Sequence, residues 1–72
     1  MNNNEKTVYY NHIGGVIGLP YEDSKCVERF DREFSALVCN GICKEHERWD
    51  YINHNLHEEG IIDDHIFITR RR

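Results

Sequence analysis

The side chains best suited to chemistry form a stripe of metal-ligand types in the second half of the chain. Thiol, imidazole and carboxylate groups recur there at intervals of three or four residues, at Cys43, His46, Asp50, His54 and His57. If this segment is helical, such intervals place all of them on one side of the helix. Thiolates and imidazoles are ligands that zinc accepts. A metal site is therefore the first chemical hypothesis, with Cys39, Cys43 and His46 as its candidate ligands.

Two features of the stripe argue against a metal ion. A structural zinc site needs four ligands that converge on one point, whereas a stripe along a helix spreads its members over roughly 20 Å. The stripe also lacks the H-E-x-x-H zinc-protease pattern, because Asp50 stands where the second histidine should be. We predict no metal and no other cofactor, and we keep a small zinc-binding domain built on Cys39, Cys43 and His46 as an alternative.

Nucleophilic catalysis by this stripe is also disfavoured. Cys43, His46 and Asp50 are the residue types of a thiol nucleophile, its base and an orienting acid. All three would lie on one helix surface, with nothing in the sequence to form an oxyanion hole or a dry pocket beside them. The chain has 72 residues, and chains of this size bury only about 60% of their unfolded surface, which leaves no depth for a substrate cleft. We predict that the protein is not an enzyme.

Charge is distributed unevenly along the chain, whose net charge is −4. Residues 22–60 carry ten acidic and five basic side chains, whereas residues 61–72 carry two acids and three arginines. An acidic middle segment repels a phosphate backbone, so nucleic-acid binding is disfavoured. Arg70, Arg71 and Arg72 are the counter-signal, which we interpret as a solubilising tail.

Cysteine content and hydropathy favour a cytoplasmic protein. Three cysteines are an odd number, so a closed disulfide framework within one chain is not available. The apolar runs, such as residues 66–68, are far shorter than the ~20 residues that cross a bilayer. The first six residues are polar and do not resemble a secretion signal. We predict free thiols and no membrane contact.

Residue patterns predict two strands at the beginning of the chain. Residues 7–13 are rich in β-branched and aromatic types, and residues 16–19 are apolar up to Pro20. Gly14 and Gly15 between them suit a two-residue hairpin turn. A helix is expected from about residue 24, with Asp23 or Ser24 as its N-cap.

Apolar residues then recur with a helical period. One stripe contains Val27, Phe30, Phe34, Leu37 and Val38, and a second contains Ile42, Trp49, Ile52 and Leu56. Asn40 and Gly41 between the stripes predict a C-cap, and Gly60 predicts the end of the second helix. The two stripes stay in phase, so a single helix over residues 24–58, which would need a second chain to cover it, is the alternative. Residues 61–69 predict a last strand, central in the sheet because both of its faces are apolar.

Together these elements predict a small two-layer α+β domain. A three-stranded, mainly antiparallel sheet packs against a helical hairpin, in the order ββααβ. We expect a flexible tail at residues 1–6, one domain over residues 7–69 and a basic tail at residues 70–72.

The predicted function is binding rather than chemistry. A small acidic domain without a cofactor motif has the profile of an inhibitor or regulator that occupies a basic surface of another protein. Phages and mobile elements encode small proteins of this kind that block a host or defence protein, and the carboxylates could imitate nucleic-acid phosphates. The predicted contact residues are acids of the helical half, with two aromatic anchors: Glu28, Asp31, Glu33, Glu45, Glu47, Asp50, Glu58, Glu59, Trp49 and Tyr51.

A second alternative is a dimeric transcription-regulatory or nucleic-acid-associated protein that uses Arg70, Arg71 and Arg72. A homodimer is compatible with either one helix or two, and a single long helix would need one to cover its apolar stripe.

Overall fold

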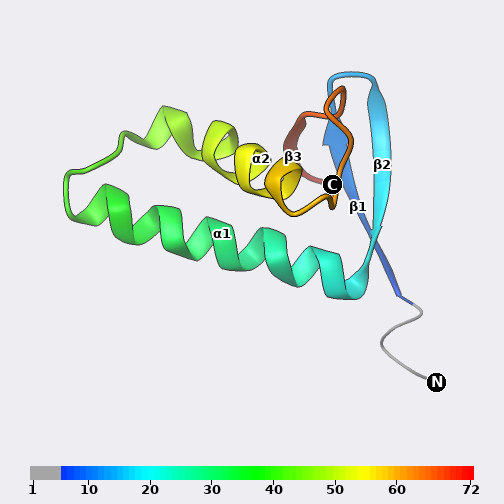
Figure 1. Ribbon diagram of the computed structural model, residues 1–72, viewed down its shortest axis with the longest axis horizontal. Coiled ribbons are helices and arrows are strands. Elements are labelled where there is room, and N and C mark those ends of the chain that lie inside the picture. The colour runs from blue at the N-terminus through cyan, green and yellow to red at the C-terminus, as the bar shows by residue number, and fades with distance from the viewer. Residues whose placement is uncertain (1–5) are drawn as a thin grey trace.

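The computed structural model describes residues 6–72 and has the predicted α+β architecture (Figure 1). Two strands come first, β1 (Thr7–His12) and β2 (Gly15–Pro20), followed by helix α1 (Tyr21–Cys39). A short 3-10 helix, η2 (Glu45–Glu47), leads into helix α2 (Arg48–Glu58), and strand β3 (Ile68–Arg71) comes last. The predicted order ββααβ is confirmed. Within residues 6–72, no helix is both long and apolar enough to cross a bilayer.

The sheet is antiparallel, and β1 lies at its centre in the order β2-β1-β3. Tyr10 pairs with Ile17 of β2 on one side and with Arg71 of β3 on the other. The prediction of a central last strand over residues 61–69 was therefore wrong. Residues 61–67 are a connection whose apolar side chains, such as the buried Ile62, pack on the core from a loop. The segment is apolar because its side chains pack on the core. It does not form a strand paired with a neighbour on each side.

The hairpin turn lies one residue earlier than predicted. β1 ends at His12, which pairs with Gly15, so the turn residues are Ile13 and Gly14. Ile13 is 80% exposed, and the Gly14 N–H donates to His12 Nδ1 at 3.0 Å. Register is set by the inward side chains, because a shift by one residue would move Tyr10 and its partners to the opposite face.

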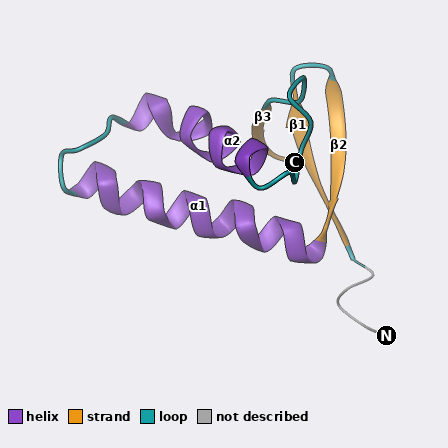
Figure 2. Cartoon of the chain, in the orientation of Figure 1, coloured by secondary structure: helices purple, strands orange, loops and turns teal. Residues whose placement is uncertain are grey.

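Both helices lie on one side of the sheet, as Figure 2 shows. The core between these layers consists of inward residues of the strands, the helices and the last connection: Tyr10, Leu19, Val27, Phe30, Ile52, Leu56, Ile62 and Ile68. Alternate residues of the strands, among them Tyr9 and Val16, face away from the helices and stay exposed.

Helix α1 begins earlier than the sequence suggested. Its N-cap is Pro20, which makes no side-chain capping bond, so the prediction of Asp23 or Ser24 as the cap was wrong. The Ser24 hydroxyl instead donates to the Tyr21 carbonyl at 2.6 Å within the first turn. Proline has a fixed φ near −65° and no N–H to satisfy, which suits a helix entrance.

A left-handed glycine ends each helix, which settles the choice between one helix and two. Gly41 has φ +73°, and the Ile42 N–H donates to the Leu37 carbonyl at 2.9 Å. Gly60 has φ +72°, and the Ile61 N–H donates to the Leu56 carbonyl at 3.0 Å. Both ends are Schellman motifs. Because the chain reverses at Gly41, Ile42 is 68% exposed and does not belong to the second apolar stripe, contrary to the prediction.

The far half of the helical hairpin extends past the sheet (Figure 1) and has its own packing centre at Phe34. Phe34 is 1% exposed but lies outside the main core cluster. The Tyr51 ring packs against it with a centroid separation of 5.3 Å, and the Arg48 guanidinium lies 5.2 Å from the Phe34 ring centroid. This local packing holds α1 and α2 together where no strand supports them.

The folded region includes residues that the sequence suggested were tails. Arg70 and Arg71 belong to β3, and the Arg72 N–H donates to the Tyr9 carbonyl at 3.0 Å. The Lys6 carbonyl accepts a bond from the Tyr21 N–H at 3.0 Å. The rest of the predicted N-terminal tail, residues 1–5, lies outside the described residues.

Candidate functional site

The Cys/His stripe does not form one helical face in the structure. Helix α2 begins only at Arg48, so Cys43 lies in the turn region and His46 in η2, while Cys39 is exposed at the end of α1. All three cysteines are free thiols. Across residues 6–72, no group of three or more His, Cys, Asp or Glu side chains is placed to hold a metal ion. His57 has a structural contact instead, with Nε2 2.8 Å from the Ile66 carbonyl oxygen.

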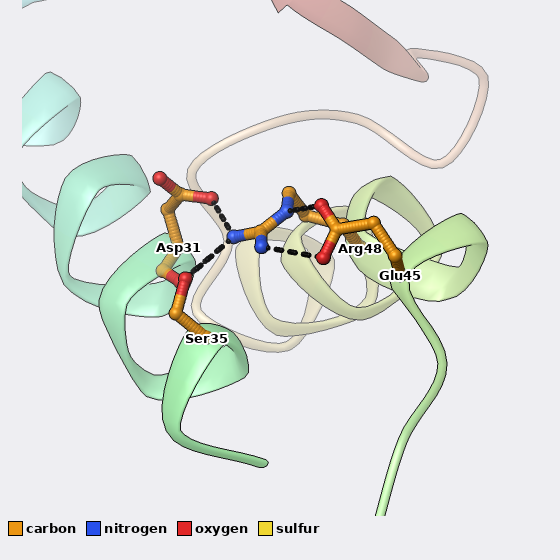
Figure 3. A network of polar contacts seen from close by, with 4 residues as sticks. All are labelled: Asp31, Ser35, Glu45 and Arg48. Carbon is orange, nitrogen blue, oxygen red and sulfur yellow. Dashed lines mark hydrogen bonds and ion pairs between the residues drawn. The ribbon is translucent and has the colours of Figure 1, made fainter. Parts of the chain in front are cut away.

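Arg48 is the centre of a polar network between the two helices, shown in Figure 3. Its Nε and Nη2 donate to the two carboxylate oxygens of Glu45, each at 2.8 Å. Its Nη1 donates to the carboxylate and the backbone carbonyl of Asp31, and also to Ser35 Oγ at 2.9 Å. We call these four residues, Asp31, Ser35, Glu45 and Arg48, the Arg48 network. It joins α1, η2 and α2 through one planar guanidinium, whose fork of donors fits a carboxylate in bidentate fashion.

The Arg48 network neutralises two of the predicted contact acids. Hydrogen bonding to Glu45 and then to Asp31 raises the pKa of the Arg48 guanidinium, and the same bond from Arg48 lowers the pKa of Glu45. A third predicted acid, Glu28, lies 3.6 Å from Arg71 of β3. Glu28, Asp31 and Glu45 thus have arginine partners within the molecule, and their charge is balanced locally.

A second group of acids surrounds a shallow groove on the helical hairpin. Glu33 and Asp31 project about 160° apart around α1, so Glu33 lies away from the Arg48 network. The groove, with a volume of about 280 Å³, is lined by Phe34, Cys43, Glu47, Asp50, Tyr51 and His54. We call these six residues the acidic groove. Its Asp50 is exposed and has no ion pair among the described residues.

Tyr51 links the acidic groove to Glu33. Its hydroxyl donates to Glu33 Oε1 at 3.2 Å. Burial raises the pKa of Tyr51, and the Glu33 carboxylate raises it further, so the phenol stays protonated as the donor. Glu47 accepts a bond from the Lys44 N–H at 3.0 Å and thereby caps η2. Hydrogen bonds thus orient the Tyr51 ring and the Glu33 and Glu47 carboxylates in and beside the acidic groove.

The last predicted acids lie near the end of α2. Glu58 and His54 approach to 3.8 Å and are both largely exposed, whereas Glu59 lies 3.6 Å from Arg29. Exposed ion pairs of this kind contribute about 0–1 kcal/mol each. Glu58 therefore adds negative charge beside the acidic groove, while the charge of Glu59 is matched by an arginine.

The two predicted aromatic anchors have different environments. Trp49 packs against the core and lines a small hollow of about 190 Å³ together with Glu28, Asp31 and Arg71. Tyr51 is half-buried at the acidic groove. Trp49 thus belongs to the packed core region, whereas Tyr51 lines the acidic groove.

A further surface was missed by sequence reasoning. On the sheet face that the helices leave uncovered, a groove of about 630 Å³ is lined by residues from both ends of the described chain: Lys6, Thr7, Val8, Tyr9, Val16, Arg71 and Arg72. Because Tyr10 is buried in the core, strand alternation places its neighbour Tyr9 on the outer face. No local pattern revealed that Lys6 and the C-terminal arginines meet beside it.

Comparisons with protein-family models, curated proteins and solved structures give no match.

Proposed function

We propose that the protein is a non-catalytic protein-binding module, an inhibitor or regulator that docks its acidic groove on a basic surface of another protein. The observation that carries the proposal is the exposed Asp50 in a groove with the fixed Tyr51 ring and the Glu47 carboxylate. Carboxylates that no arginine pairs keep their field available to an approaching cation, and complementary charge speeds and selects association.

The proposed contact surface is narrower than the sequence suggested. Glu33, Glu47, Asp50, Tyr51 and Glu58 belong to it, because they lie in or beside the acidic groove. Glu28, Asp31, Glu45, Glu59 and Trp49 are assigned to the scaffold, because each is paired with an arginine or packed on the core. Aromatic side chains flanked by charge are common anchors of interfaces, which gives Tyr51 the central position.

A small regulator of this kind fits the type that phages and mobile elements encode against host or defence proteins, acting in the cytoplasm. If the carboxylates imitate phosphates, an oligonucleotide will displace the captured partner; if they do not, the complex will survive such competition.

The test compares two variants that remove the same charge. Asp50→Asn with Glu58→Gln removes two acids from the proposed surface, and Asp63→Asn with Asp64→Asn removes two exposed acids from the connection before β3. Each variant and the unaltered chain are immobilised and used to capture proteins from cell lysate at 50 mM and 500 mM salt. We expect a basic protein that is captured at low salt, lost at high salt, lost with the first variant and retained with the second. Equal capture by both variants would contradict the proposal.

A further inference from the structure

The sheet face opposite the helices carries a half-exposed aromatic ring. Tyr9 of β1 pairs with Gly18 of β2. A Cβ at Gly18 would meet the Tyr9 ring at 3.0 Å from Cε1 and 3.3 Å from Cδ1, so this edge of the ring lies directly over the glycine. Tyr9 is nevertheless 54% exposed. Glycine at position 18 therefore lets the ring rest on the sheet while much of its surface faces solvent.

Cations surround this ring, and they come from distant parts of the chain. Lys6, Arg71 and Arg72 line the same groove as Tyr9 and Val16, and a neighbouring hollow of about 400 Å³ is lined by Asn11, Arg70, Arg71 and Arg72. Neither hollow is lined by a carboxylate from residues 6–72, although Glu28 lies 3.6 Å from Arg71 on the helix side. The strands themselves contain no aspartate or glutamate.

The fold thus brings the basic residues at the two ends of the described chain together on the sheet. The acids lie on the helices and their connections, whereas the sheet and its flanking residues are basic. We call the basic surface around the ring, formed by Lys6, Tyr9, Val16, Arg70 and Arg72, the outer sheet face. The net charge of −4 for the whole chain acts only weakly on this face, because exposed charges at physiological salt are screened over about 8 Å.

We propose that the outer sheet face binds single-stranded nucleic acid. A base stacks on the open side of the Tyr9 ring, next to the apolar Val16, and the flanking phosphates contact Lys6, Arg70 and Arg72. Aromatic rings on an open sheet face with lysine and arginine around them are the chemistry that holds unpaired bases. A duplex is excluded as the occupant, because its bases are already stacked and cannot present a face to Tyr9. An acidic peptide would match the charges but would leave the ring unused.

The experiment measures fluorescence anisotropy of labelled 12-nucleotide strands, dT12 and rU12, with the full chain at 50–300 mM salt. We expect saturable binding at low salt. Tyr9→Ser weakens binding at least fivefold, since stacking of one base is worth about 1–3 kcal/mol, whereas Tyr9→Phe keeps the affinity within twofold. Arg70→Gln with Arg72→Gln lowers the slope of log K against log salt by about 1.4, at roughly 0.7 for each phosphate that the variant no longer neutralises.

A matched control removes two cations elsewhere. Lys25→Gln with Arg32→Gln changes the net charge equally but lies on exposed positions of α1, and it should leave the affinity within twofold. Circular dichroism on every variant confirms that the fold is intact. A preference for rU12 or dT12 identifies RNA or DNA as the source of the strand, and either supports the proposal.

Four outcomes would overturn it. These are no saturable binding to either strand, equal affinity of Tyr9→Ser and the unaltered chain, tighter binding to the matching duplex, and sedimentation of a dimer that Tyr9→Ser dissociates. The last result would show that a second copy of the chain covers this face. The acidic groove lies on the helical hairpin, away from the outer sheet face. A negative result for protein capture by the acidic groove would therefore leave the nucleic-acid binding measurements unaffected.

Discussion

The side-chain amide of Asn53 pairs with both backbone polar groups of Ile68. Asn53 Nδ2 donates to the Ile68 carbonyl at 2.8 Å, and its Oδ1 accepts from the Ile68 N–H at 2.7 Å. Both residues are essentially inaccessible to solvent, at 1% and 0% exposure. Asn53 thus acts as a peptide group of an additional strand at the first residue of β3, and it joins α2 to the sheet.

Replacing Asn53 should therefore be costly. Asn53→Leu leaves the Ile68 N–H and carbonyl buried without partners, and each such group costs about 1–3 kcal/mol. We expect a loss of about 2–4 kcal/mol in the free energy of unfolding, measured by urea denaturation. Asn55→Leu is the matched control, because Asn55 makes a single bond to the Tyr51 carbonyl within α2 and should lose less than about 1 kcal/mol. Equal losses would show that the Asn53–Ile68 pairing is not a special contact.

Arg48 should not tolerate replacement by lysine. Lysine keeps the charge but cannot bond the Glu45 carboxylate, Asp31 and Ser35 at once, and it loses the guanidinium contact with the Phe34 ring. Because the acidic partners are half or more exposed, we expect a modest loss of about 1–2 kcal/mol in unfolding free energy. Arg32→Lys, at an exposed position of α1, should change it by less than about 0.5 kcal/mol. An unchanged free energy of unfolding in Arg48→Lys would contradict the stabilising role of the Arg48 network.

Acid should weaken the Arg48 network at Glu45. The pKa of Glu45 is lowered in the folded protein, so its contribution to stability is present above the ordinary value of 4.5 and is lost as pH falls through the lowered value. We expect the unfolding free energy to fall between pH 6 and pH 3, and Glu45→Gln to reduce this fall. Chemical denaturation at intervals of half a pH unit measures both curves. Parallel curves would show that Glu45 does not contribute to acid sensitivity.

Gly60 should resist substitution by residues with a side chain. Its φ of +72° is unfavourable for any residue with a Cβ, although a Cβ there would meet no atom within 4 Å. Gly60→Ala should therefore lose about 1–2 kcal/mol through backbone strain alone. Gly60→Asn should lose less, since asparagine adopts this conformation more readily. Thermal unfolding of both variants measures the difference, and equal losses would point to a cause other than backbone conformation.

The sequence was sufficient for the fold wherever a pattern is local. β-Branched and aromatic composition predicts the hairpin strands, a period of three to four predicts both helices, and Gly41 and Gly60 mark their ends. The bounds of the last strand could not be predicted correctly, because Ile61 and Ile62 have the apolar side chains expected of a buried strand. Both pack on the core, and only the tertiary structure shows that they do so from a loop.

The candidate sites could be predicted in part. Residue type alone identifies the acids, but whether each one is free depends on partners far along the chain. Asp31 is bound by Arg48, 17 residues away, and Glu28 lies beside Arg71 of another element. The Glu45–Arg48 pair, three residues apart, and the His54–Glu58 pair, four apart, have spacings that sequence can recognise. For the same reason, the sequence could not show that Lys6 and Arg72, at opposite ends of the described chain, line one groove.

Strand β1 obtains its second neighbour from the end of the described chain, because Tyr10 pairs with Arg71. During synthesis, a nascent polypeptide that stops before residue 68 contains both helices and the first hairpin but lacks the third strand. Asn53 then has no backbone to bind, and one edge of β1 stays open to other molecules. Such an edge recruits foreign strands. Completion of β3 covers this edge of β1 and gives the buried Asn53 amide its partners, so the incomplete chain exposes both until the last strand is made.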